Sequence, residues 1–406
     1  MLKNKKPEIR INGFDDSWAA RKLSDEFSDF IVPMRDKPKA FGGNIPWTRI
    51  EDITGRCLNG SISGQYVSEE TVKEMNLKII PKDSLIVSSS ATFGVVAIVT
   101  QNLITNQTFI GLVPKDKSAL DYWYAYFHSN EAREYMKLQS AGSTIFYIAR
   151  ECFENMPISV PQKDEMKMIG AYFYNMDSLI ELHQREIDRL ICVRKAMLEK
   201  MFPQGDSDVP AVRFGQYKKP WKLCKFSEIF TERHVIDTIS DEYPQLAFTI
   251  EEGVIRPEDK KTNKRDFLII DKATKKYLQT EYDDIIYNPA NVIFGAIHRN
   301  ALGKGCVSPI YKIFYTDQDS TFMECIVRHP RFIKEISRSM EGTVKKLRTL
   351  KPKAFLDMSA YIAPTIEEQK QIGEYFKQMD RLIEIEKEEL EKIKHIKSAC
   401  LEKMFV

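Results

Sequence analysis

The side chains that could do chemistry are scattered along this chain of 406 residues and form no catalytic motif. No Gly-x-x-x-x-Gly-Lys-Ser/Thr segment occurs, and residues 303–305 (Gly-Lys-Gly) predict only a turn, so no ATP-binding loop is expected. Residues 288–291 (Asn-Pro-Ala-Asn) lack the second proline and the aromatic residue of the Asn-Pro-Pro-Tyr segment of amino-methyltransferases, and they predict a turn. Residues 257–260 (Pro-Glu-Asp-Lys) are interpreted as a charged loop instead of a nuclease triad. The sequence therefore predicts a protein that is not an enzyme by itself.

The seven cysteines and six histidines are not grouped at the spacing of a metal site. The cysteines are odd in number and form no Cys-x-x-Cys pair, which indicates reduced thiols rather than a disulfide framework. The first residues contain no apolar segment typical of a secretory signal. Apolar runs such as residues 95–99 are far below the roughly 20 residues that cross a bilayer. We expect a cytoplasmic protein that binds no metal and does not contact a membrane.

Basic and hydroxyl side chains in predicted loops suit contacts with nucleic-acid phosphates and grooves. In the second half, a Gly-Thr turn at 342–343 leads into a basic cluster that ends at residue 353, at the place that Gly-Ser-Thr 142–144 occupies in the first half. A formal net charge of +2 means that any such binding would depend on local patches. An ordinary solvated surface is the alternative for any one cluster. The candidate contact residues are Arg49, Ser89, Ser90, Thr92, Ser143, Thr144, Arg150, Lys264, Arg265, Arg299, Thr343, Lys345, Lys346 and Arg348.

The elements that would position these residues belong to an internal repeat with an offset of 203 positions. Residues 160–203 align without a gap on residues 363–406, and 19 of these 44 positions are identical. The same offset pairs Arg10 with Arg213 and Trp18 with Trp221. The chain is therefore a tandem duplication in which a globular segment and a long helix each occur twice. An enzyme rarely needs two copies of itself in one chain, whereas a binding protein with two recognition heads does.

The repeated C-terminal segments predict two long helices, because apolar residues recur at helical spacing and prolines are absent from their interiors. About 40 helical residues span ~60 Å, and such a helix must bury its apolar stripe. Since the ends of a domain usually lie close together, the two helices are expected to pair antiparallel within the chain, around a pseudo-twofold axis. Pairing with the helices of another chain is the alternative. The predicted packing residues are Ile169, Phe173, Met176, Ile180, Ile187, Ile372, Phe376, Met379, Ile383 and Leu390.

The two globular segments have the pattern of mixed α/β domains. Short strands are expected at 45–50, 83–87, 95–99 and 108–113 in the first, and at 246–250, 284–287 and 310–315 in the second. One amphipathic helix is expected in each, at 121–138 and at 322–340. The predicted fold class is α+β, with two globular mixed domains separated by two long antiparallel helices in a circular internal repeat. The expected division is 1–159, 160–203, 204–361 and 362–406.

These features resemble one known family over the whole chain, the DNA-specificity (S) subunits of type I restriction–modification systems. The resemblance is carried by the Pro-x-x-Arg-Phe…Trp segment that contains Arg213 and Trp221, by the strand-like residues 45–50, and by the second helix. The helix signature consists of Glu368-Gln369, Ile372, Met379-Asp380, Ile383, Leu401 and Met404-Phe405. The first helix departs from it with Glu165-Met166, which we interpret as a surface change.

The resemblance implies that 1–159 and 204–361 are target-recognition domains. Each would bind half of a bipartite, asymmetric DNA site, with the conserved helices 160–203 and 362–406 as the spacer. It also implies two adenine-N6 methyltransferase (M) subunits along the helices and a motor–nuclease (R) subunit for cleavage. No cofactor is then expected in this chain, and S-adenosylmethionine, ATP and Mg²⁺ belong to the partners. The alternative is a two-headed protein-interaction adaptor on a coiled-coil rod, which steep salt dependence of duplex binding would separate from the first interpretation.

Overall fold

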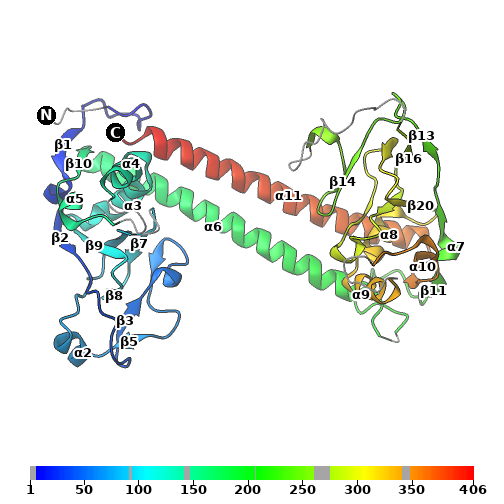
Figure 1. Cartoon of the computed structure of the whole chain (residues 1–406), viewed down its shortest axis with the longest axis horizontal. Coiled ribbons are helices and arrows are strands. Elements are labelled where there is room, and N and C mark those ends of the chain that lie inside the picture. Colours follow the sequence, from blue (N-terminus) through cyan, green and yellow to red (C-terminus); the bar gives the residue numbers. More distant parts are fainter. Residues whose placement is uncertain (1–5, 91–93, 141–146, 206, 260–274, 341–347) are drawn as a thin grey trace. The chain divides into compact units, whose positions relative to one another are not determined.

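The computed structural model describes residues 6–90, 94–140, 147–205, 207–259, 275–340 and 348–406. The chain forms two compact units, one of Met1–Arg185 with Lys387–Val406 and the other of Glu186–Glu386. Both boundaries fall inside the long helices α6 (Lys163–Lys200) and α11 (Ile366–Lys403) (Figure 1). Each unit therefore consists of one globular head, the start of one long helix and the end of the other.

The first head is built on a five-stranded sheet of order β2-β9-β6-β7-β4. Its central strands β6 (Ser84–Ser88), β7 (Val96–Val99) and β9 (Phe109–Pro114) are antiparallel and almost wholly buried, as expected for runs of β-branched and aromatic residues. The edges are β2 (Phe27–Ile31) and β4 (Cys57–Leu58). A three-stranded sheet, β5-β3-β8, is formed by β3 (Ile45–Thr48), β5 (Tyr66–Val67) and β8 (Ile104–Thr105). The short helices are α1 (Leu23–Glu26) and α2 (Glu69–Glu74).

The second head has a smaller core sheet of order β12-β20-β17-β18. These strands are β12 (Phe230–Glu232), β20 (Lys312–Thr316), β17 (Ile285–Tyr287) and β18 (Ile297–Arg299). Two further sheets are β13-β16-β19 and β14-β15. Their strands are β13 (Ile236–Asp237), β16 (Tyr277–Thr280), β19 (Gly305–Val307), β14 (Ala247–Thr249) and β15 (Gly253–Ile255), and α7 (Phe226–Ile229) precedes β12.

In both heads, a two-stranded antiparallel ladder joins the beginning of the head to its end. In the first head, β1 (Ala19–Lys22) pairs with β10 (Pro157–Val160), and in the second, β11 (Lys222–Lys225) pairs with β21 (Ser359–Ile362). The strands that end these ladders lead directly into α6 and α11. The start of each head is thereby held beside the start of the following long helix.

The prediction of a single amphipathic helix in each head is wrong, because each head contains two shorter helices in its place. The first head has α3 (Leu120–His128) and α4 (Asn130–Gln139), and the second has α8 (Ser320–Val327) and α9 (Pro330–Ser339). The breaks lie at Ser129 and His329, whose backbones are extended and whose side chains accept hydrogen bonds from Ala132 N and Arg331 N. A buried N-cap restarts the helix in a new direction. The short helices before the final ladders are α5 (Arg150–Glu154) and α10 (Pro352–Leu356).

The fold class inferred from the sequence is confirmed: the heads are mixed α/β, and the long helices run antiparallel within each unit. In the first unit, the start of α6 lies beside the end of α11, where Phe173 and Phe405 stack with ring centroids 5.7 Å apart. In the second unit, the end of α6 lies beside the start of α11, where Phe202 and Phe376 are 6.1 Å apart. Across the described residues, no helix is long and apolar enough to span a membrane.

Candidate functional sites

A buried ion pair ties the start of each head to the first turn of its long helix. Arg10 donates two hydrogen bonds to Glu165, of 2.7 and 2.8 Å, and Arg213 donates two to Glu368, of 2.6 and 2.8 Å. Both carboxylates are fully buried. The paired geometry is the strong form of an arginine–carboxylate contact, and the carboxylate also suits the positive end of the helix dipole. The hydrogen bond to Glu165 raises the pKa of Arg10.

These two anchors are equivalent in the repeat, since both partners are related by the offset of 203. Trp221 adds a hydrogen bond of 3.2 Å from Nε1 to Glu368, whereas Nε1 of the equivalent Trp18 is buried without a partner among the described residues. The arginine of the Pro-x-x-Arg segment therefore positions the head on the helix. That contact accounts for its occurrence in both halves.

The residue after each buried glutamate corrects the sequence interpretation. Met166 is not on the surface, because it packs into the core of the first head. The equivalent Gln369 is also buried and is held by its side-chain amide. Its Nε2 donates to Ala363 O and to Gln318 Oε1, both at 2.9 Å, and its Oε1 accepts from Asp319 N at 3.0 Å. The exchange of glutamine for methionine therefore replaces a polar junction with an apolar one.

A glycine on each long helix lets the head approach the helix closely. A Cβ placed on Gly170 would lie 2.7 Å from Tyr122 N, and one on Gly373 would collide with Thr321 Oγ1 and lie 2.9 Å from Phe322 N. The start of α3 thus rests on α6, and the start of α8 rests on α11. The two glycines are again 203 positions apart.

The end of each long helix completes the core of a head. Phe405 packs against Tyr122, Tyr126 and Phe173 in the first unit, and Phe202 packs against Trp221 and Phe322 in the second. Ion pairs between the helices accompany these contacts, from Lys397 to Asp177 and from Arg194 to Asp380. The two ion pairs are equivalent in the repeat, since Asp177 corresponds to Asp380 and Arg194 to Lys397 at the offset of 203.

Of the ten helix residues predicted to pack, Ile180 is half-buried and the others are buried. Their surroundings differ from the expectation of a simple two-helix seam. Ile169, Phe173 and Met176 belong to the core cluster of the first head, and Ile372 and Phe376 to that of the second. The helices are therefore structural parts of the heads at their ends. Met379, Ile383, Ile187 and Leu390 are buried along the helix bodies.

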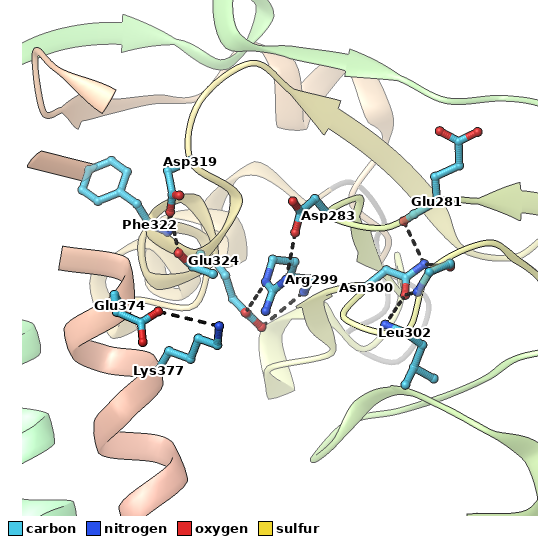
Figure 2. A network of polar contacts seen from close by, with 12 residues as sticks. Glu281, Asp283, Arg299, Asn300, Leu302, Asp319, Phe322, Glu324, Glu374 and Lys377 are labelled. Carbon is cyan, nitrogen blue, oxygen red and sulfur yellow. Dashed lines mark hydrogen bonds and ion pairs between the residues drawn. The ribbon is translucent and has the colours of Figure 1, made fainter. Parts of the chain in front are cut away.

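The residues predicted to contact nucleic acid differ in how exposed they are. Arg299 is the clearest disagreement: its side chain is only 9% exposed, and it pairs with Asp283 at 2.8 Å and with Glu324 at 3.5 Å (Figure 2). Burial beside two carboxylates leaves no charge for a phosphate, so this arginine is structural. Ser89 is also buried, and its hydroxyl donates to Thr108 O at 3.3 Å.

The other described candidates lie nearer to solvent. Arg150 pairs with Glu154 at 2.6 Å and lies 3.8 Å from Asp29, and Arg49 pairs with Glu51 at 3.0 Å. Ser90 is half-buried and forms an antiparallel bridge with Tyr147, while Arg348 is exposed. The remaining candidates lie outside the described residues: Thr92, Ser143, Thr144, Lys264, Arg265, Thr343, Lys345 and Lys346.

The described residues that follow the Gly-Ser/Thr segments 142–144 and 342–343 form similar backbone hydrogen bonds in the two heads. In the first head, Ile148 N donates to Ser89 O at 2.8 Å. In the second, Leu350 N donates to Pro289 O at 3.0 Å. The turn at 288–291 was expected, and Asn288 Oδ1 accepts from Ala290 N and Asn291 N to form it. In each head, then, a residue just after a core strand accepts a backbone hydrogen bond from the chain that follows the Gly-Ser/Thr segment.

A polar network near Arg299 was not found from the sequence. Asn300 is fully buried, and its side-chain amide donates to Glu281 O and Gly303 O and accepts from Leu302 N (Figure 2). The neighbouring Asp284 accepts from Glu281 N and Thr280 Oγ1, and burial raises its pKa. These groups are mutually satisfied and hold a turn. Among the described residues, no cluster of three or more histidine, cysteine, aspartate or glutamate side chains could hold a metal ion.

Comparisons with known proteins agree with this architecture. Residues 26–191 match the family described as the type I restriction modification DNA specificity domain. The chain is 23% identical over 397 residues to the MjaVIII specificity subunit of Methanocaldococcus jannaschii, covering 91% of this chain and 90% of the relative. It is 28% identical over 198 residues to the MjaIX specificity subunit of the same organism. That match spans 48% of this chain and about half, 46%, of the relative.

Solved structures share the fold. The S subunit of a type I restriction–modification system from M. genitalium matches with a TM-score of 0.61 over 99% of both chains, at 16% sequence identity. The duplicated chain of two α/β heads, each followed by a long helix, therefore shares its fold with that S subunit. The resemblance found in the sequence is confirmed: residues 26–191 match the type I restriction modification DNA specificity domain, and the chain is similar over most of its length to a specificity subunit of a type I restriction enzyme.

Proposed function

We propose that this chain recognises a bipartite, asymmetric DNA sequence, with one half-site bound by each head, and that it has no catalytic activity of its own. The observation that supports this most directly is that the two heads contact their helices in the same way but differ in their surfaces. Both units contain the arginine–glutamate pair, the glycine of the long helix and the phenylalanine that follows the end of a long helix. The sheets and the exposed side chains of the two heads differ. Two heads that are attached to the helices in the same way, but expose different side chains, are suited to recognise two different sequences.

The catalytic groups would then come from partners. We propose that two methyltransferase subunits supply S-adenosylmethionine and methylate adenine at N6, and that a motor–nuclease subunit supplies ATP hydrolysis and Mg²⁺ for cleavage. Among the relatives, a solved structure with a TM-score of 0.52 concerns complex assembly of a type I restriction–modification system. It covers 96% of this chain at 13% identity.

The long helices carry a face that suits such a partner. Apolar side chains remain exposed at equivalent positions of both helices: Leu179 and Leu382, Leu182 and Ile385, and Val193 and Ile396. At 100° per residue, the positions on one helix fall within about 60° of one another. Exposed leucine and isoleucine in a helical stripe are typical of a surface that another helix covers. Because the stripe occurs twice, two copies of one partner are expected.

The test is copurification of the full chain with a type I methyltransferase subunit, followed by duplex binding at several salt concentrations. The proposal predicts a complex of one specificity chain with two methyltransferase chains and a steep loss of affinity with salt. Leu179→Glu with Leu382→Glu should abolish copurification, whereas Glu181→Lys with Glu384→Lys, on the same helices but away from that stripe, should not. Peptide or protein partners with duplex binding that ignores salt would instead support the adaptor.

A further inference from the structure

Helix α9 of the second head carries a line of cations that the equivalent helix of the first head lacks. The register between α4 and α9 is fixed by their buried residues, since Ala132 corresponds to Phe332 and Met136 to Ile336. Their N-caps, Ser129 and His329, are also both buried. An offset of 200 therefore relates these two helices.

With this register, two of the three outward positions are opposite in charge, and the third carries a cation in α9 only. Arg331, Lys334 and Arg338 in α9 correspond to Glu131, Glu134 and Leu138 in α4. The three cations are exposed and recur at spacings of three and four residues, so they share one face. The structure shows no ion pair for any of them within its described part. Helix α9 contains three cations and one carboxylate, net +2, whereas α4 contains two of each, net zero.

The neighbouring helix shows the same reversal. Helices α9 and α10 pack through Phe332 and Phe355, with ring centroids 6.5 Å apart. Lys353, exposed on α10, corresponds to Glu151 on α5 of the first head, through the ladders that follow both helices. Two adjoining helices of the second head thus place cations where the first head has carboxylates.

An exposed aromatic side chain lies beside this surface. The short 3-10 turn Val292–Phe294 packs against α9, and Phe294 is 68% exposed. Unpaired cations on a rigid helix, next to an exposed ring, suit the backbone of a nucleic-acid duplex better than an acidic peptide, because phosphates recur at a regular spacing along it. The cations carry no base information by themselves, so they would add affinity without adding sequence preference.

We infer that Arg331, Lys334 and Arg338 form a phosphate-binding face, by which the second head supplies more of the nonspecific affinity for duplex DNA than the first head does. The biological meaning of this inference rests on the proposed function. Binding of duplex DNA by this face can be measured without partner subunits and without a known recognition sequence. The first head, with Glu131 and Glu134 at these positions, would have to depend more on its specific contacts.

The test is binding of the full chain to a duplex of random sequence, measured by fluorescence anisotropy at several salt concentrations. Replacing Arg331, Lys334 and Arg338 with glutamine should lower the slope of log affinity against log salt by about 2 to 3. Affinity at 0.1 M salt should fall on the order of a hundredfold. The matched control replaces Lys218, Lys219 and Lys225 with glutamine, which removes the same charge elsewhere on the second head.

A reciprocal variant, Glu131→Arg with Glu134→Lys and Leu138→Arg, should raise the slope by placing the cations on the first head. An unchanged slope in the α9 variant, or an equal decrease in the control, would overturn the inference. The outcome is separable from the proposed function: loss of sequence preference in the wild-type complex would defeat that function. A slope lowered by the α9 variant alone would still identify a phosphate-binding face.

Discussion

Replacing Arg213 with methionine tests whether the repeated anchor holds the second head to its helix. The side chain of Arg213 is 9% exposed, and Glu368 is fully buried, with hydrogen bonds of 2.6 and 2.8 Å between them. Without the arginine, the partner left to the Glu368 carboxylate among the described residues is Trp221, whose Nε1 donates a hydrogen bond of 3.2 Å. Leaving a buried charge without its partner costs about 3–5 kcal/mol. For a unit of this size, 1 kcal/mol shifts Tm by roughly 2–4 °C, so we expect a decrease of about 6–20 °C.

The assay is differential scanning calorimetry of the full chain, with Arg10→Met as the matched variant in the first unit. Removing both charges, by Arg213→Met with Glu368→Leu, should restore part of the loss, because neither group is then left buried and charged. The reasoning is refuted if Arg213→Met costs less than about 1 kcal/mol, or if the double variant is less stable than the single one.

Three further predictions concern the packing and the titrating groups. Gly170→Ala should destabilise the first unit despite the better helix propensity of alanine, because the added Cβ would lie 2.7 Å from Tyr122 N. Urea denaturation measures the change in stability, and a more stable variant would disprove the close approach. Burial lowers the pKa of His298 to about 4, below its unfolded value near 6.5, so stability should fall as the pH drops from 6.5 to 4, by on the order of 3 kcal/mol. His298→Gln should remove that part of the pH dependence, and an unaltered profile would count against it. A fragment of residues 186–386 should unfold cooperatively in circular dichroism, whereas 204–361, which lacks the helix ends of the core, should not; equal stability of the two would contradict the shared core.

The repeat and the long helices could be predicted because their signal is local and occurs twice. Apolar spacing over about 40 residues marks a helix whatever it packs against, and an offset of 203 links equivalent contacts such as Asp177–Lys397 and Asp380–Arg194. The core strands at 83–87, 95–99 and 108–113 were also near their observed positions, since buried strands are runs of β-branched residues.

What the sequence could not predict depends on contacts between distant segments. Arg299 looked available for DNA, but folding brings Glu324 to it, and the pairing of β17 with β18 places Asp283 beside it. Met166 looked exposed because nothing near it in the sequence shows that the first head covers it. The break before α9 was a missed local signal, because Pro330 disfavours helical continuity with the preceding residue. Most of the loop candidates for DNA contact stay predictions, since they lie outside the described residues.

Mapping methylated adenines in DNA from cells that carry this gene and a type I methyltransferase gene tests the central claim most directly. The account predicts one bipartite motif, with two different half-sites at a fixed separation. Exchanging the first head for that of a relative should change one half-site and leave the other intact. A contiguous motif, or a change in both half-sites on exchange of one head, would contradict the assignment of one half-site to each head.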